Sequence, residues 1–213
     1  MPVSYELYYF DFHGLAIIPR TLLSLGEFKW TNRAPEDWKS EKPTTPFTHV
    51  PVLTGFQEDG SKFVLAEAQA IYRYLARKMD ILGKTDHEMA LVEQFCFSWE
   101  ELHEKYWPLL YGWKNLLTPE QYDETLQKVL HEQIKPIVMK HEEALAKNGT
   151  GFYVGDNMTL ADIHATISVP FLNHGGTLFT KESFPNLFAL HEKLMANEII
   201  HKVFHRYPMN PTV

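Results

Sequence analysis

Two places in the sequence hold residues whose types and spacing could bind a metal or carry out a reaction. His201 and His205 stand four residues apart in a stretch with helical periodicity, a spacing that is typical of zinc ligands. No acidic third ligand is evident nearby, and a lone histidine pair near a helix end is usually solvated, so we expect no metal site. The single cysteine, Cys96, excludes an internal disulfide bond and is expected to be a buried apolar thiol.

The dipeptide Val50-Pro51 raises a second question about binding. Pro51 precedes the apolar run VLTGF, and proline cannot donate to a β ladder, so we expect Pro51 to begin a strand. The peptide bond before a proline can also be cis. Two interpretations remain open: Pro51 simply begins a strand, or the Val50 backbone offers its N–H and C=O to a ligand instead of to the sheet.

The elements that position these residues can be predicted from hydrophobic periodicity and turn signals. Asp59-Gly60 is a strong hairpin signal between two apolar runs. A strand, a helix and a second strand come first, which predicts a parallel pair with a right-handed crossover. The expected elements, in chain order, are a strand over 4–10, a helix over 15–26, a strand over 27–33, an irregular stretch over 34–50, strands over 51–56 and 62–65, and a helix over 67–79.

From residue 80 onward the pattern is almost entirely helical. Pro136 should kink or split one of these helices, because its ring removes an i→i−4 hydrogen bond, and a break is expected near Asn197. Thr159 and Asp162 fit a capping box, with the threonine hydroxyl at the helix start and the aspartate reaching back. The expected helices cover 86–115, 118–147, 159–173 and 185–205.

The order of elements predicts an α/β domain followed by an all-α domain. We expect a βαβ–ββα domain over residues 1–80, a linker over 81–85 and an all-helical domain over 86–213.

Composition excludes several classes of function. The chain has 213 residues and a formal net charge of −7, which argues against general nucleic-acid binding because that needs a basic face. No run of about 18 apolar residues suggests a membrane span, and the N-terminus lacks the pattern of a secretory signal. We therefore expect a cytoplasmic protein without a membrane or nucleic-acid partner.

Four motifs, in the right order and spacing, resemble the cytosolic glutathione transferases, especially the sigma class. They are LYYF near the start, EDWKSEKPTTPFTHVPVL, AIYRYLARK and YVGDNMTLADI. The resemblance runs nearly from end to end. It implies a thioredoxin-like N-terminal domain, a helical C-terminal domain, glutathione as co-substrate, a hydrophobic electrophile, a role in detoxification and a homodimer.

By the LYYF match, the resemblance implies that Tyr9 is catalytic. The thiol of glutathione must ionise to become a nucleophile, and a free thiol has a pKa near ~8.5. A phenol that donates a hydrogen bond to sulfur stabilises the thiolate and lowers this pKa. Tyr8 is the neighbour on the strand and is expected to pack as an ordinary aromatic residue.

The resemblance also implies a set of glutathione-binding residues. Trp38 and Lys42 align with residues at the glycyl end, the Val50 backbone would pair with the cysteinyl residue across a cis bond, and Glu67 would receive the amine. Glu101 aligns with an acidic residue that reaches the amine across a dimer interface, or it is a solvated helix charge. The full set is Phe10, Trp38, Lys42, His49, Val50, Pro51, Glu67, Ala68 and Glu101.

Four positions differ from the family pattern. Ala68 stands where a serine hydroxyl would bond the γ-glutamyl carboxylate, although its backbone N–H at a helix N-terminus can still do so. The lost bond should cost about 0.5–3 kcal/mol, or roughly 2- to 150-fold in affinity. His13 and Leu15 replace arginines that follow the catalytic tyrosine, so we expect Tyr9 to act with less electrostatic help. His49 stands where relatives carry lysine or glutamine.

Two functions are therefore weighed. The first is a transferase in which Tyr9 polarises the thiol for conjugation or isomerisation of an apolar electrophile. The second is a catalytically weak or inactive relative that binds ligands or serves a structural role. The electrophile would lie between the domains, and its candidate residues are Phe12, Phe97, Trp107, Tyr111 and Trp113.

Overall fold

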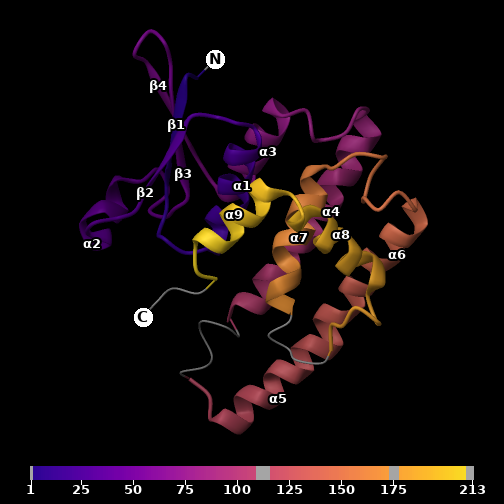
Figure 1. Cartoon of the computed structure of the whole chain (residues 1–213). Helices are drawn as coiled ribbons and strands as arrows, with labels where there is room; N and C mark the ends of the chain where they lie inside the picture. The colour runs from indigo at the N-terminus through magenta and orange to yellow at the C-terminus, as the bar shows by residue number, and fades with distance from the viewer. Residues whose placement is uncertain (1, 109–115, 173–177, 210–213) are drawn as a thin grey trace. The chain divides into compact units, whose positions relative to one another are not determined.

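The computed structural model describes residues 2–108, 116–172 and 178–209, apart from the Phe171 side chain. Its contacts divide the chain into two compact units (Figure 1). The first unit combines Met1–Ile81 with Met195–Val213, and the second covers Leu82–Leu194.

The first unit is built on a four-stranded mixed sheet with the order β2-β1-β3-β4. β1 and β2 are parallel, as predicted for a strand–helix–strand unit, whereas β1 with β3 and β3 with β4 are antiparallel. Gly60, at φ +80°, forms the turn of the predicted hairpin between β3 and β4. The strands are β1 (Ser4–Tyr8), β2 (Trp30–Arg33), β3 (Val52–Phe56) and β4 (Lys62–Ala66).

Helices of the first unit cover this sheet and one another. α3 packs against β3, β4 and α1, and α9 packs along α1. Leu7, Leu22, Leu53 and Leu75 are fully buried in the resulting core. The helical segments are a 3-10 turn (Gly14–Ala16), α1 (Ile17–Leu25), α2 (Trp38–Glu41), a second 3-10 turn (Lys42–Thr44), α3 (Ala68–Lys78) and α9 (Glu198–Arg206).

Two local differences from the predicted elements have clear physical reasons. β2 begins at Trp30 and not at residue 27, because the N–H groups of residues 26–28 close the end of α1 by bonding carbonyls of its last turn. The stretch 34–50, expected to be irregular, contains α2. Asp37 caps this helix by accepting a hydrogen bond from the Lys39 N–H at 3.2 Å.

The C-terminal helix was expected to be part of the helical domain over residues 86–213, but the contacts group it with the first unit. α9 belongs to the first compact unit because it packs along α1, and the His13 imidazole Nε2 hydrogen-bonds the carbonyl of Phe204 on α9 at 2.7 Å. These compact units are defined by contacts alone, so the domain boundaries expected from the sequence stay a prediction.

The second unit is helical, as predicted. A π-helical segment (Leu130–Ile134) stands immediately before Pro136, where the missing N–H was expected to interrupt the helix. α8 ends before Asn197, which caps α9. The α-helices are α4 (Asp86–Trp107), α5 (Pro119–Val129), α6 (Lys135–Asn148), α7 (Leu160–Leu172) and α8 (Pro185–Met195).

The start of α7 is held by a buried carboxylate. Asp162 accepts hydrogen bonds from the Thr159 N–H at 2.7 Å and the Tyr153 N–H at 2.8 Å, so it reaches back as expected. The Thr159 hydroxyl differs from the expected cap, because it donates to the same carboxylate at 2.7 Å.

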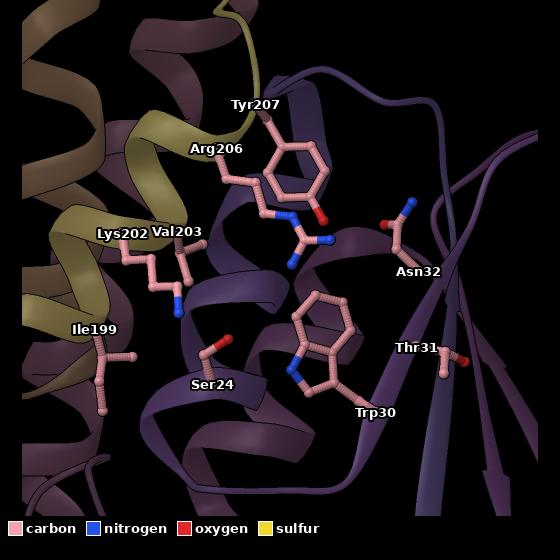
Figure 2. A pocket seen from close by; sticks show the side chains of 9 residues that line it. All are labelled: Ser24, Trp30, Thr31, Asn32, Ile199, Lys202, Val203, Arg206 and Tyr207. Atoms are coloured by element: carbon pink, nitrogen blue, oxygen red, sulfur yellow. The ribbon is translucent and has the colours of Figure 1, made fainter.

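Neither a membrane span nor a group of three metal-ligating side chains occurs among the described residues. The rings of His201 and His205 lie 4.2 Å apart on α9. The first unit contains a cavity of about 550 Å³ bordered by α1, β2 and α9 (Figure 2).

Candidate functional site

Three strand ends meet at one end of the sheet in the first unit. Val52 lies opposite Tyr8 of β1 and opposite the last residue of β4. Continuing the register by one residue brings Tyr9, Pro51 and Glu67 to the same end of the sheet. Residues that are far apart in the sequence are therefore brought together by strand pairing.

The Val50-Pro51 peptide bond is cis, as the resemblance implies. Both residues are buried. Among the described residues, no turn or loop hydrogen bond uses the Val50 N–H or C=O. The backbone at this point is therefore suited to pair with an extended peptide ligand.

The Tyr9 side chain is 7% exposed, and its hydroxyl oxygen accepts a hydrogen bond from the Leu15 N–H at 3.1 Å. Burial raises the pKa of Tyr9, while this hydrogen bond and the charge of Arg20 lower it by smaller amounts. Tyr9 is thus a neutral phenol at pH 7. Its oxygen already has a donor, so its own hydrogen is available for an acceptor such as a sulfur anion.

Arg20 is a buried cation near Tyr9 that the sequence analysis did not single out. Its guanidinium lies 5.8 Å from the centroid of the Tyr9 ring and donates to the carbonyls of Phe10 and Phe12, at 2.7 and 2.6 Å. It also donates to the Asn32 side chain. These bonds fix the loop that follows β1 and place a positive charge near the phenol. This chain has His13 and Leu15 at the two positions where the family pattern has arginines.

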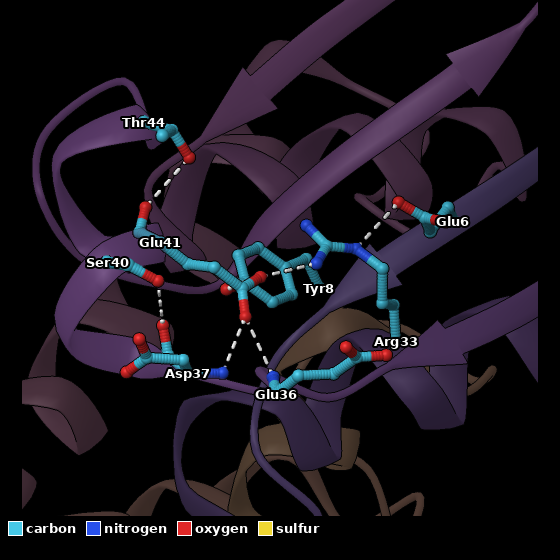
Figure 3. Close-up of polar contacts among 8 residues, drawn as sticks. All are labelled: Glu6, Tyr8, Arg33, Glu36, Asp37, Ser40, Glu41 and Thr44. Carbon is cyan, nitrogen blue, oxygen red and sulfur yellow. Dashed lines mark hydrogen bonds and ion pairs between the residues drawn. The ribbon is translucent and has the colours of Figure 1, made fainter.

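Glu41 organises the segment that carries Trp38 and Lys42 (Figure 3). One carboxylate oxygen accepts hydrogen bonds from the N–H groups of residues 36 and 37, and the other accepts from the Tyr8 hydroxyl and the Arg33 guanidinium, both at 2.7 Å. The Tyr8 hydrogen bond is the main cause that lowers the pKa of Glu41 to about 2. Tyr8 therefore has a positioning role, and sequence patterns gave no signal for Glu41.

Aromatic contacts connect α2 to the end of β1 and to the residues that follow it. The Trp38 ring packs edge-on against Phe10, with centroids 5.4 Å apart, and against Tyr8 at 6.5 Å. Phe10 in turn lies 5.8 Å from Tyr9. Lys42 is exposed at the end of α2. The structure thus brings Phe10 and Trp38 to the Tyr9 end of the sheet.

His49 and Glu67 form a hydrogen-bonded pair at the same end, with Nε2 2.8 Å from the carboxylate. Glu67 has φ +72°, a conformation that non-glycine residues rarely adopt, and it contributes no side-chain cap to α3. The first N–H groups of α3, beginning with Ala68, therefore lack an intrahelical partner. Such a helix start can bind a carboxylate.

The remaining predicted residues are placed less directly. Glu101 is on α4, and its carboxylate lies 3.0 Å from the Lys105 ammonium one helical turn later. Phe12 lies 5.6 Å from the Tyr9 ring, whereas Phe97 and Trp107 are on α4 in the second unit. Two further candidates, Tyr111 and Trp113, lie outside the described residues.

Comparisons with known proteins identify the family of the chain. Residues 100–205 match the family model described as glutathione S-transferase, C-terminal domain. Glutathione S-transferase 1 of Ascaris suum is 36% identical over 172 residues, covering 78% of this chain and 79% of that protein. S-crystallin SL11 of Nototodarus sloanii is 29% identical over 198 residues, covering 91% and 92%.

A solved sigma-class transferase from Fasciola hepatica superposes with a TM-score of 0.84 at 23% identity, covering 98% of this chain and 99% of that one. At this identity the likeness establishes the fold alone. The expected thioredoxin-like domain with its helical partner is confirmed, and the similarity to the Ascaris suum enzyme over more than two thirds of both chains is decisive for the family. The chain belongs to the glutathione S-transferase family.

Proposed function

We propose that this transferase activates glutathione through the Tyr9 hydroxyl and transfers the sulfur to a hydrophobic electrophile, or isomerises one. The observation that carries the proposal is the buried, neutral Tyr9 phenol, which accepts from the Leu15 N–H and keeps its own hydrogen for another acceptor. A hydrogen bond from this phenol stabilises the thiolate more than the thiol and so lowers the thiol pKa.

The tripeptide would lie along the free backbone beside the cis bond. In this arrangement the Val50 N–H and C=O pair with the cysteinyl residue, and the Ala68 N–H meets the γ-glutamyl carboxylate. Glu67 receives the amine, and this contact replaces the hydrogen bond that Glu67 makes with His49 in the structure. Trp38 and Lys42 hold the glycyl end.

We further propose a cytoplasmic homodimer of the sigma class with a role in detoxification. Names of related proteins include the mu, sigma, nu and pi classes, so the class rests on the LYYF motif. In the dimer, Glu101 of one subunit would reach the amine bound by the other. Phe12, beside Tyr9, is the aromatic side chain that we assign to the electrophile.

Binding of reduced glutathione tests the proposal, with thermal unfolding as the readout. A ligand present at 100 times its dissociation constant stabilises the folded state by about 2.7 kcal/mol, which should raise Tm by roughly 5–10 °C in a chain of this size. We expect a saturable rise at millimolar glutathione. The matched control is the same concentration of the tripeptide Gly-Gly-Gly, which should leave Tm unchanged. A flat response to glutathione would favour the alternative below.

Gly14 offers a sharper test of the Tyr9 hydroxyl. A Cβ on Gly14, at φ +39°, would lie 2.3 Å from the Tyr9 hydroxyl oxygen. We expect Gly14→Ala to displace this oxygen and to lower kcat/KM for conjugation by about 100-fold, the scale of a misplacement of about 1 Å.

Gly60→Ala is the control for this substitution. Gly60 also has a positive φ, +80°, but its added Cβ would meet nothing within 4 Å. Both variants should lose comparable backbone stability, and only Gly14→Ala should lose activity. Equal kinetics in the two variants would contradict the proposed position of the phenol.

The alternative function is a weak or inactive relative with a ligand-binding or structural role. It is favoured by Ala68, which lacks the hydroxyl that would bond the glutathione carboxylate, and by the 29% identity to S-crystallin SL11. His13 also has a structural position, because it is fully buried and its backbone N–H donates to the Pro208 carbonyl at 2.8 Å.

A further inference from the structure

The α2 segment (residues 36–44), which carries Trp38 and Lys42, has little of its own to hold it in place. α2 has four residues and the 3-10 turn that follows it has three, and neither contains a buried residue. A helix of one turn does not form by itself, because fixing the backbone of that turn costs more than its hydrogen bonds return. The position of this segment must therefore come from contacts with the sheet.

Glu41 connects the α2 segment to two strands of the sheet. One oxygen of its carboxylate accepts hydrogen bonds from the Tyr8 hydroxyl of β1 and from the Arg33 guanidinium of β2, both at 2.7 Å. The other oxygen accepts from the N–H groups of residues 36 and 37, at 2.8 and 3.0 Å, and so closes the start of the segment (Figure 3). A carboxylate has about four acceptor positions, and these four hydrogen bonds fill them.

Arg33 offsets the negative charge that Glu41 brings next to Lys42. The Arg33 guanidinium pairs with the Glu41 carboxylate and lies 3.5 Å from the centroid of the Tyr8 ring, so the cation itself is held on β1. In the described part of the chain, no ion pair involves Lys42. The Lys42 ammonium is therefore left for the carboxylate of a ligand.

We propose that Glu41, held by Tyr8 and Arg33, is a positioning residue that makes the enzyme select the full tripeptide over γ-glutamylcysteine, which is glutathione without its glycine. This inference rests on the proposed function, in which Trp38 and Lys42 hold the glycyl end. Because Glu41 fixes the α2 segment before the ligand arrives, binding does not have to order that segment. The effect falls on affinity and not on kcat, since the thiol is activated at Tyr9.

The test is a calorimetric titration of the whole protein with glutathione and with γ-glutamylcysteine, both kept reduced. We expect the wild type to bind glutathione at least about tenfold more tightly, the scale of one hydrogen bond to a charged group. Glu41→Gln keeps the shape of the side chain, but its NH2 group faces donors that the carboxylate accepted. This variant should bind glutathione about tenfold more weakly, with an equal rise in KM and an unchanged kcat, and should bind γ-glutamylcysteine as the wild type does.

Glu58→Gln is the control, because it removes the same charge from an exposed position of the hairpin in the same unit. It should bind both ligands as the wild type does. An equal loss for the two ligands in Glu41→Gln, or no loss for either, would overturn the inference. Equal affinity of the wild type for both ligands would also overturn it and leave the proposed function intact. A wild type that binds neither ligand would contradict the proposed function as well.

Tyr8→Phe gives an independent measurement, because it removes one of the donors to Glu41 and keeps the ring. In the wild-type background it should weaken glutathione binding by about threefold or more. In the Glu41→Gln background it should have little further effect, since the two substitutions break the same contact. Additive losses would show that Tyr8 acts without Glu41 and would contradict the assigned network. Thermal unfolding of each variant checks that it is folded.

Discussion

Replacing Tyr9 with phenylalanine is expected to lower kcat for glutathione conjugation by about 100-fold, the scale seen when one hydrogen-bond donor to a developing anion is removed. The affinity for glutathione should change little, because the backbone contacts of the tripeptide do not use the phenol. Steady-state kinetics with an aryl halide electrophile, together with the thermal-shift titration, would separate the two effects.

The pH profile of the Tyr9→Phe variant identifies the cause of its lower rate. Burial raises the pKa of Tyr9, so the phenol stays protonated and the rise of rate with pH follows ionisation of the thiol. Without the phenol, the apparent thiol pKa should move up toward the ~8.5 of a free thiol, and part of the lost rate should return at high pH.

Tyr5→Phe is the matched control for the Tyr9 variant. Tyr5 is a buried tyrosine of β1 whose hydroxyl hydrogen-bonds the Tyr74 hydroxyl at 3.2 Å. This variant should keep the wild-type rate and pH profile. A Tyr9→Phe enzyme with an unchanged rate would remove the phenol from the mechanism while leaving the family assignment intact.

Replacing Asp162 with alanine should destabilise the protein by about 3 kcal/mol or more, because three buried donors lose their acceptor and each unsatisfied group costs about 1–3 kcal/mol. The donors are the N–H groups of Tyr153 and Thr159 and the Thr159 hydroxyl. Urea unfolding at pH 7 measures the change. The control is Asp156→Ala, whose carboxylate is exposed and 3.5 Å from Lys84, and which should cost at most about 1 kcal/mol.

The cost of Asp162→Ala should also depend on pH. Burial is the main cause that raises the pKa of Asp162 to about 6, against the opposing effect of its hydrogen bonds. An aspartate in the unfolded chain has a pKa near ~3.9, so protonation favours the folded state. The stability difference between wild type and variant should therefore grow as the pH falls from 7 to 5, and a difference that shrinks would contradict this assignment.

Much of the fold could be predicted because its signals are local. The break before Pro136 follows from one missing N–H, the hairpin at Gly60 follows from a short turn sequence, and the helices follow from hydrophobic periodicity. Element ends were less predictable. Residues 27 and 28, which were expected to begin β2, close the end of α1 instead, through an interaction that no periodic pattern contains.

The candidate site could be predicted at positions where a single residue type provides the required chemistry by itself. A tyrosine on the first strand and a proline before the third could be identified from the motifs that surround them. Glu41 could not, because its importance depends on four donors that come from three different segments of the chain. Arg20 lies eleven residues beyond Tyr9 in a helix, and only folding places its charge near the phenol.

By itself, then, the sequence determined which elements form, in what order, and which family they resemble, since these depend on neighbours along the chain. The tertiary structure alone decided what surrounds each group: the donor on the Tyr9 oxygen, the network around Glu41, the partner of His49 and the cavity beneath α9. The physical reason is that burial, hydrogen bonding and electrostatic effects act through space, between residues whose separation in the sequence carries no information about their distance.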